Sequence, residues 1–433
     1  MLRCMSTWMA TLVLAACGRT PGMDVIARRA PVEAERSQPG CLAAVSGSER
    51  VVHDVLRDQA ALRKNSGDPS AWLRVGEDFV RVARNESEPA YYEHAADCAR
   101  NALARSPADA AALRLLGLSL LNDHRFAEAR TQAQTLLARH PEDAVSWGTL
   151  SDAELELGNL SGAIAAAQEM IDRKPNLPSY GRAAHLRWLQ GDRAGAKRIY
   201  QQAIAAGREQ RDPEPRAWML VQAAWVFWHE GDYAGARAGF ELALAAVPDY
   251  APALEGRGRS LLALGDYAGA IATLSQALAR HPLAETAWAL GDAQSLSGHA
   301  AAADQAYARV ERDAALFDPR TLSLFYSTKQ RQPGRALSLA RQAFAERQDV
   351  YTKDALAFAL LRAGRGDEAL RIARDVIALE TPDARLLYHA GLIERENGAA
   401  ERGEALIAQA LRLNPRFDPV LTEHRPLPAS RAL

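Results

Sequence analysis

Residues 216–249, RAWMLVQAAWVFWHEGDYAGARAGFELALAAVPD, contain two apolar stretches of helical spacing that a short polar segment separates. Within each stretch, apolar residues recur three and four positions apart, around a small residue such as Ala224 or Ala236. This spacing predicts two amphipathic helices. Gly231 lies between them, where glycine commonly ends a helix, and Pro248 follows the second, where proline stops it. The stretch therefore predicts two antiparallel helices joined by a tight turn.

The same pattern recurs along most of the chain. The residues equivalent to Ala236 are Ala95, Ala129, Ala163, Ala196, Ala236, Ala270, Ala303, Ala336, Ala369 and Gly403. Successive members lie 33 or 34 residues apart, except for a step of 40 between Ala196 and Ala236. Nine of the ten units carry a second small residue in the first helix, and Leu324 is the exception. Glycines expected at the turns are Gly158, Gly191, Gly231, Gly265, Gly298, Gly364 and Gly398. A period of this length indicates a repeat protein.

This pattern resembles the tetratricopeptide repeat, a helix–turn–helix unit of 34 residues, and the resemblance covers roughly residues 69–417. Residues 253–282, ALEGRGRSLLALGDYAGAIATLSQALARHP, match it closely. The resemblance implies an all-α fold, an α-solenoid superhelix of about ten tandem tetratricopeptide helix–turn–helix repeats, in which each unit covers the next. Residues 49–64 predict an amphipathic helix that caps the first repeat.

Composition and motifs favour a binding protein over an enzyme. The net charge is −1, and no basic stripe is present to neutralise nucleic-acid phosphates. The sequence contains no GxGxxG, P-loop, GxSxG or HExxH motif. His94 and Cys98 share a predicted helix face, but two ligands are too few for a metal site. We therefore expect no catalytic residues, cofactor or metal, and acidic residues confined to solvent-facing positions.

The first residues predict export. Residues 1–16 contain a short apolar run, too short to span a membrane but suited to a signal peptide. Leu14-Ala15-Ala16-Cys17 resembles the lipobox of bacterial lipoproteins. That resemblance implies a lipidated Cys17, a membrane contact through the lipid and, with Gly18, a place on the outer membrane facing the periplasm. An ordinary signal peptide, or a chance match in a cytoplasmic adaptor, is the alternative.

Two further segments and two cysteines complete the expected organisation. Residues 17–48 predict a flexible tether, and residues 418–433 a C-terminal tail. Once Cys17 is lipidated and the signal is removed, Cys41 and Cys98 remain as a possible disulfide pair. An oxidising envelope compartment permits the bond. Two free thiols are the alternative.

By analogy with the family, certain positions of each first helix line the concave face, where a protein or peptide ligand binds. From the fourth repeat onward, large apolar residues occupy these positions. They are Trp188, Trp218, Val221, Trp225, Trp228, Trp288, Phe325, Phe358 and Tyr388. One interpretation is an exposed partner-binding groove; the other is that neighbouring helices or the C-terminal tail bury the rings. A scaffold for envelope complexes is the leading functional hypothesis, and a carbohydrate-binding module the alternative.

Overall fold

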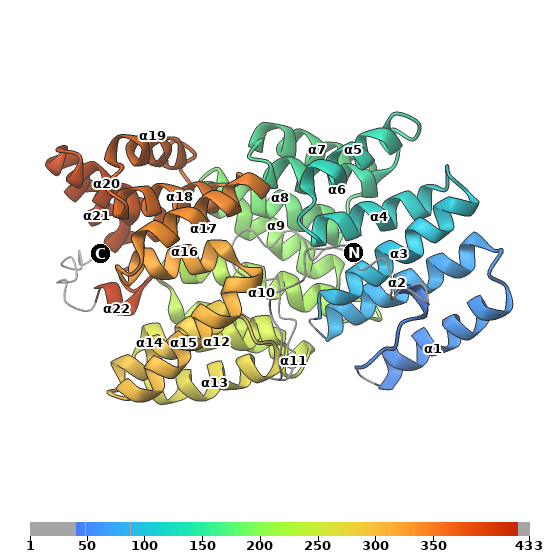
Figure 1. Cartoon of the computed structure of the whole chain (residues 1–433), viewed down its shortest axis with the longest axis horizontal. Coiled ribbons are helices and arrows are strands. Elements are labelled where there is room, and N and C mark those ends of the chain that lie inside the picture. Colours follow the sequence, from blue (N-terminus) through green and yellow to red (C-terminus); the bar gives the residue numbers. More distant parts are fainter. Residues whose placement is uncertain (1–39, 48, 87, 423–433) are drawn as a thin grey trace. The chain divides into compact units, whose positions relative to one another are not determined.

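A computed structural model describes residues 40–47, 49–86 and 88–422 of the chain. This part is helical, with 22 α-helices and one short 3-10 helix, η2 (Gly40–Leu42). Successive helices pack as antiparallel pairs, coloured from blue to red along the chain in Figure 1. The predicted all-α array of tandem helix–turn–helix repeats is therefore confirmed.

Ten helix pairs follow a leading helix and precede a short final one. The leading helix is α1 (Glu49–Lys64), which has the predicted bounds, and the final one is α22 (Pro419–Thr422). The pairs are α2 (Pro69–Asn85) and α3 (Ala90–Arg105); α4 (Ala110–Asn122) and α5 (Phe126–Leu137); α6 (Ala144–Glu156) and α7 (Leu160–Arg173); α8 (Leu177–Leu189) and α9 (Arg193–Ala206); α10 (Glu214–His229) and α11 (Tyr233–Ala246); α12 (Ala251–Leu264) and α13 (Tyr267–Arg280); α14 (Ala284–Leu296) and α15 (Ala300–Phe317); α16 (Pro319–Thr328) and α17 (Pro333–Glu346); α18 (Val350–Arg362) and α19 (Gly366–Ile377); and α20 (Ala384–Glu396) and α21 (Ala400–Leu413).

The turn inside each pair follows from a few residues. Gly191 ends the first helix of the fourth repeat with a φ of 83°, which side chains other than glycine rarely adopt. Asp192 follows it and accepts a hydrogen bond from the Gly195 amide at 2.8 Å, which caps the second helix. The fifth and sixth repeats repeat this Gly-Asp arrangement, so the turns depend on local sequence.

The helices form two compact units, of which one contains the described residues up to Ala153 and the other begins at Glu154. In the smaller unit, α1 to α4 enclose a core that includes Trp72, Phe79 and Tyr92. In the larger unit, two apolar clusters extend from α6 to the strap, the segment of residues 414–422 that follows α21. Each unit therefore has an apolar core of its own.

Within the larger unit, the array winds back on itself. The last turns of α6, α8 and α10 accept hydrogen bonds from the residues that follow α17, α19 and α21. These bonds run from Gln348 N to Glu156 O (2.7 Å), from Thr381 Oγ1 to Leu189 O (2.7 Å) and from Asn414 Nδ2 to Trp228 O (2.8 Å). Each bond satisfies a carbonyl at a helix end and joins a repeat to the fifth repeat after it. We call this row of contacts the seam.

Substitution of two glycines distinguishes the contribution of the seam to stability from that of the turn. Gly158 and Gly298 have φ values of 81° and 82°. A Cβ atom at Gly158 would lie 2.7 Å from the Gln348 carbonyl oxygen, whereas one at Gly298 would meet nothing within 4 Å. We expect Gly298→Ala to lose about 1 kcal/mol of unfolding free energy from the positive φ alone. Gly158→Ala should lose about 1–3 kcal/mol more of unfolding free energy, because the added methyl group forces the two sides of the seam apart. Equal urea midpoints for the two variants would show that the seam adds no stability.

Candidate functional site: the interior of the larger unit

The large apolar residues predicted to line a groove lie inside the larger unit. Their exposed fractions are 0% for Trp188, Val221, Trp225, Phe325 and Phe358, 2% for Trp218, 3% for Tyr388 and 7% for Trp228, and Trp288 is half-buried. The Trp225 ring meets the edges or faces of Trp228 and Phe240 at centroid distances of 5.4 and 5.0 Å. These are ordinary distances for aromatic pairs inside a protein core.

The structure therefore corrects the hypothesis of an exposed aromatic groove and agrees with the alternative, in which neighbouring helices bury the rings. The physical reason is the seam. Because the fourth and fifth repeats contact the ninth and tenth, the inner side chains of α8, α10, α18 and α20 pack into one apolar cluster. Only Trp288, near the strap after α21, is partly accessible.

Charged residues share this interior, and sequence reasoning missed them by placing acidic residues on solvent faces. Their shared feature is a contact between an acidic and a basic side chain, of which at least one is buried. The pairs are Arg347 with Glu156 (2.7 Å) and Asp349 (2.9 Å), Arg320 with Asp349 (3.7 Å), Arg259 with Glu255 (2.9 Å) and Glu285 (3.6 Å), Lys329 with Asp292 (2.9 Å), His229 with Asp383 (3.5 Å) and His389 with Asp354 (2.9 Å). We call them the polar layer. Several occupy the same inner positions as the aromatic residues, which is the signal that could have revealed them.

Burial sets the ionisation of this layer. The pKa of Glu285 is raised to about 8, chiefly by desolvation; the opposing charge of Arg259 lowers it and the nearby Glu255 adds to the rise. Desolvation also lowers the pKa of His229 to about 4, despite the neighbouring Asp383. At neutral pH the Glu285 carboxyl is therefore largely protonated and the His229 ring is neutral, which reduces the charge that the interior must hold.

Glu285→Gln should consequently change how stability depends on pH. The folded-state pKa of Glu285 lies above the unfolded value, so the stability it contributes below pH 4.5 is lost as pH rises towards 8. Glutamine resembles the protonated acid and does not ionise. We expect the variant to exceed the wild type by at least about 1 kcal/mol in unfolding free energy at pH 8 and to match it at pH 4.5. A variant that is less stable at pH 8 would mean that Glu285 is ionised and paired with Arg259.

A cavity of about 70 Å³ opens at one side of this interior. Helices α10, α12, α14 and α20 line it with Trp228, Arg259, Trp288 and Arg385. The residues that follow α21 line its remaining side, with Phe417 among them. A volume of this size holds a few water molecules or one small side-chain group. We call it the strap cavity.

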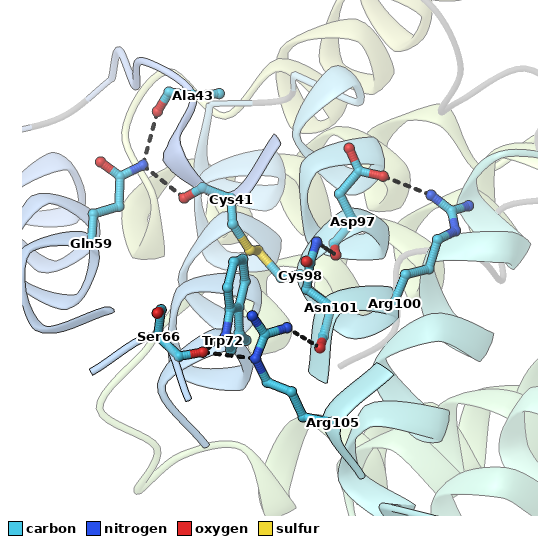
Figure 2. Close-up of a disulfide and its surroundings, with 10 residues drawn as sticks. All are labelled: Cys41, Ala43, Gln59, Ser66, Trp72, Asp97, Cys98, Arg100, Asn101 and Arg105. Atoms are coloured by element: carbon cyan, nitrogen blue, oxygen red, sulfur yellow. Dashed lines mark hydrogen bonds and ion pairs between the residues drawn. A yellow bond between two sulfur atoms is a disulfide. The ribbon is translucent and has the colours of Figure 1, made fainter. Parts of the chain in front are cut away.

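The smaller unit contains a disulfide between Cys41 and Cys98, which the sequence had left open (Figure 2). Both cysteines are fully buried. The Gln59 side chain donates hydrogen bonds to the carbonyl oxygens of Cys41 (3.1 Å) and Ala43 (2.8 Å), which holds the segment in place. Residues 40–47 therefore pack against α1 and α3, and this end of the predicted flexible tether is corrected to an ordered segment.

Removal of this disulfide should destabilise the smaller unit. The bond closes a loop with a sequence separation of 57 residues, and cross-links of this kind contribute about 2–4 kcal/mol. We expect Cys98→Ser to lower the urea midpoint of this unit by a corresponding amount, and a reducing agent to do the same to the wild type only. If reduction leaves the wild-type transition in place, the disulfide contributes nothing to stability.

The remaining predicted site residue, Cys17, lies outside the described residues, as do the predicted signal peptide and residues 423–433 of the tail. Among the helices that the structure describes, none is long and apolar enough to cross a membrane. The described residues also hold no cluster of three or more histidine, cysteine, aspartate or glutamate side chains fit for a metal ion.

Family models of the tetratricopeptide repeat match three parts of the chain, residues 115–178, 227–291 and 355–416. No curated protein sequence matches the chain. Among solved structures, PilW, described as a widely conserved type IV pilus biogenesis factor, is 15% identical with a TM-score of 0.40, over 46% of this chain and 91% of PilW.

Two other solved structures show likeness over more of the chain. A human IFIT1 dimer with m7Gppp-AAAA is 13% identical, with a TM-score of 0.48, over 84% of this chain and 86% of that one. The Cut9–Hcn1 hetero-tetramer of the APC/C is 14% identical, with a TM-score of 0.37, over 88% and 96%. These likenesses carry no information on partner or location. The matched segments and the ten helix pairs lead to one conclusion: the chain folds as tandem tetratricopeptide helix–turn–helix repeats.

Proposed function

We propose that this protein is a lipid-anchored scaffold that binds other proteins and assembles a complex in the bacterial cell envelope. The repeat array supports the binding role, because stacked helical repeats create extended binding surfaces. The anchor is the lipidated Cys17, and the expected place is the outer membrane, facing the periplasm. The protein acts without a cofactor of its own.

One observation supports the envelope location most directly. The Cys41–Cys98 disulfide joins two fully buried cysteines, and such bonds persist in oxidising compartments rather than in the cytoplasm. It also lies where the tether meets the repeats, so that a chain anchored at Cys17 would transmit tension to a cross-linked segment. The cytoplasmic-adaptor alternative offers no reason for this bond.

The carbohydrate-binding alternative loses its main support. Sugars stack on exposed aromatic faces, whereas all but one of the predicted platform residues are at most 7% exposed. Trp288 alone is half-buried and does not form a platform. A protein ligand remains the partner class that the repeat family favours.

Membrane fractionation tests the anchor. We expect the wild type in the outer-membrane fraction and Cys17→Ser in the soluble periplasmic fraction. Cys4→Ser serves as the matched control, because the proposed cleavage removes Cys4, and its distribution should equal that of the wild type. An unchanged distribution of Cys17→Ser would refute lipid anchoring.

Cross-linking in intact cells, followed by denaturing purification, tests the scaffold role. We expect one or more envelope proteins joined covalently to the wild type and fewer joined to Cys17→Ser. Recovery of the chain joined only to itself would contradict the proposed role in assembly.

A further inference from the structure

The segment that follows the last repeat crosses the open side of the strap cavity. Residues 414–422, which we call the strap, run from the end of α21 to α22, which packs on α14. The Phe417 ring packs on Tyr388 at a centroid distance of 5.3 Å, and Phe417 lines the cavity together with Trp228 and Trp288. The strap thus places one aromatic side chain over an interior that is otherwise filled.

The strap has the form of a short peptide ligand. The Arg416 amide donates to the Tyr233 hydroxyl at 3.0 Å, which fixes the turn before Phe417. Asp418 accepts a hydrogen bond from the Leu421 amide at 2.9 Å and so caps α22, which begins at Pro419. The strap therefore presents an aromatic residue directly before a capped helical turn. Residues 415–422 can leave without breaking a helix pair or the seam bond that Asn414 makes to Trp228.

The walls of the strap cavity carry more hydrogen-bond donors than the strap uses. Among the described residues, the indole N–H groups of Trp228 and Trp288 and the Nε of Arg385 are buried without a hydrogen-bond partner. Buried donors without partners are uncommon and call for an explanation. Backbone carbonyl groups of a partner peptide are acceptors of the kind that these donors lack.

We propose that the strap cavity is a docking site for a partner peptide with an aromatic anchor followed by an Asp-Pro-type capped turn, and that the strap occupies it in the absence of the partner. This inference rests on the proposed protein-binding function and names the class of ligand. It differs from an open groove, because a single aromatic side chain enters the cavity while the other inner rings stay buried. The sequence of the strap gives the pattern expected of the ligand. The strap also competes with the ligand for the cavity and so regulates its binding.

A peptide with the strap's own sequence, residues 414–422 (Asn-Pro-Arg-Phe-Asp-Pro-Val-Leu-Thr), is the direct probe. Labelled at its N-terminus, it should bind full-length Phe417→Ala at least tenfold more tightly than the wild type, measured by fluorescence anisotropy, because the variant strap competes poorly. A probe with alanine at the Phe417 position should not bind. The matched control is Phe344→Ala, which truncates a half-buried phenylalanine that does not line the cavity and should bind like the wild type.

A second variant covers the case in which Phe417→Ala fails to fold. Asp418→Ala removes the cap of α22 and leaves Phe417 in place, and it should bind the probe more tightly than the wild type does. If either variant is folded by circular dichroism and binds no better than the wild type, the docking site is refuted. The assay uses neither membrane nor partner, so its failure is distinguishable from that of the envelope function, which fractionation and cross-linking measure.

Discussion

Trp225→Ala should destabilise the larger unit by about 3–5 kcal/mol, the usual cost of truncating a large buried aromatic side chain. The Trp225 ring is fully buried and packs at 5.0 Å from Phe240 and 5.4 Å from Trp228. Removal of the indole leaves a void that the seam prevents the surrounding helices from closing. Urea unfolding followed by circular dichroism measures the effect.

The control for this variant is Trp225→Phe, which retains an aromatic ring and should lose less than half as much stability. The outcome also separates the two interpretations of the aromatic residues. In an open groove, Trp225→Ala would spare the fold and abolish only binding. A variant with an unchanged urea midpoint would therefore restore the groove and contradict the packing described above.

Arg347→Leu should cost about as much, roughly 3–5 kcal/mol, because it removes the cation from a buried ion pair. The Arg347 guanidinium lies 2.7 Å from Glu156 and 2.9 Å from Asp349, and its side chain is 10% exposed. Its loss leaves the two acids facing each other across the seam, beside the hydrogen bond from Gln348 to Glu156. We expect a lower urea midpoint and weaker hydrogen-exchange protection of the Gln348 amide.

Arg280→Leu is the matched control, since Arg280 pairs with Asp249 at the surface, where both side chains are more than 40% exposed. A surface pair of this kind contributes about 0–1 kcal/mol, so this variant should unfold near the wild-type midpoint. Equal losses in the two arginine variants would show that the buried pair has no special role.

Much of the fold could be predicted because its determinants are local. Gly191 and Asp192 specify a turn and a helix cap within five residues, and small residues such as Ala236 mark where two helices cross closely. In the eighth repeat, the small residue is missing from its expected position, and the neighbouring position takes over its role. Leu324 is buried at the exceptional site, and the neighbouring Ser323 provides the small side chain and bonds the Ala336 carbonyl at 2.8 Å.

The interior could not be predicted, because it depends on how far the array winds. The family analogy places Trp188 and Trp225 on the inner face of the array. The sequence of one repeat does not show that the fifth repeat after it returns to cover this face. The same limit applies to Glu285 and Asp349. Their charge predicted exposure to solvent, although both side chains are buried. Only the summed rotation of successive repeats brings these residues together.

The seam alters how the molecule would bear a load. A solenoid whose repeats contact only their neighbours extends like an open spring, one unit at a time. Here hydrogen bonds join Glu156, Leu189 and Trp228 each to a residue more than 180 positions later, so that distant repeats are connected. Tension applied along the chain must first break these hydrogen bonds, all at the same time. A protein held at a membrane and pulled by a bound complex would therefore behave as a stiff coupling, with little stretch before it yields.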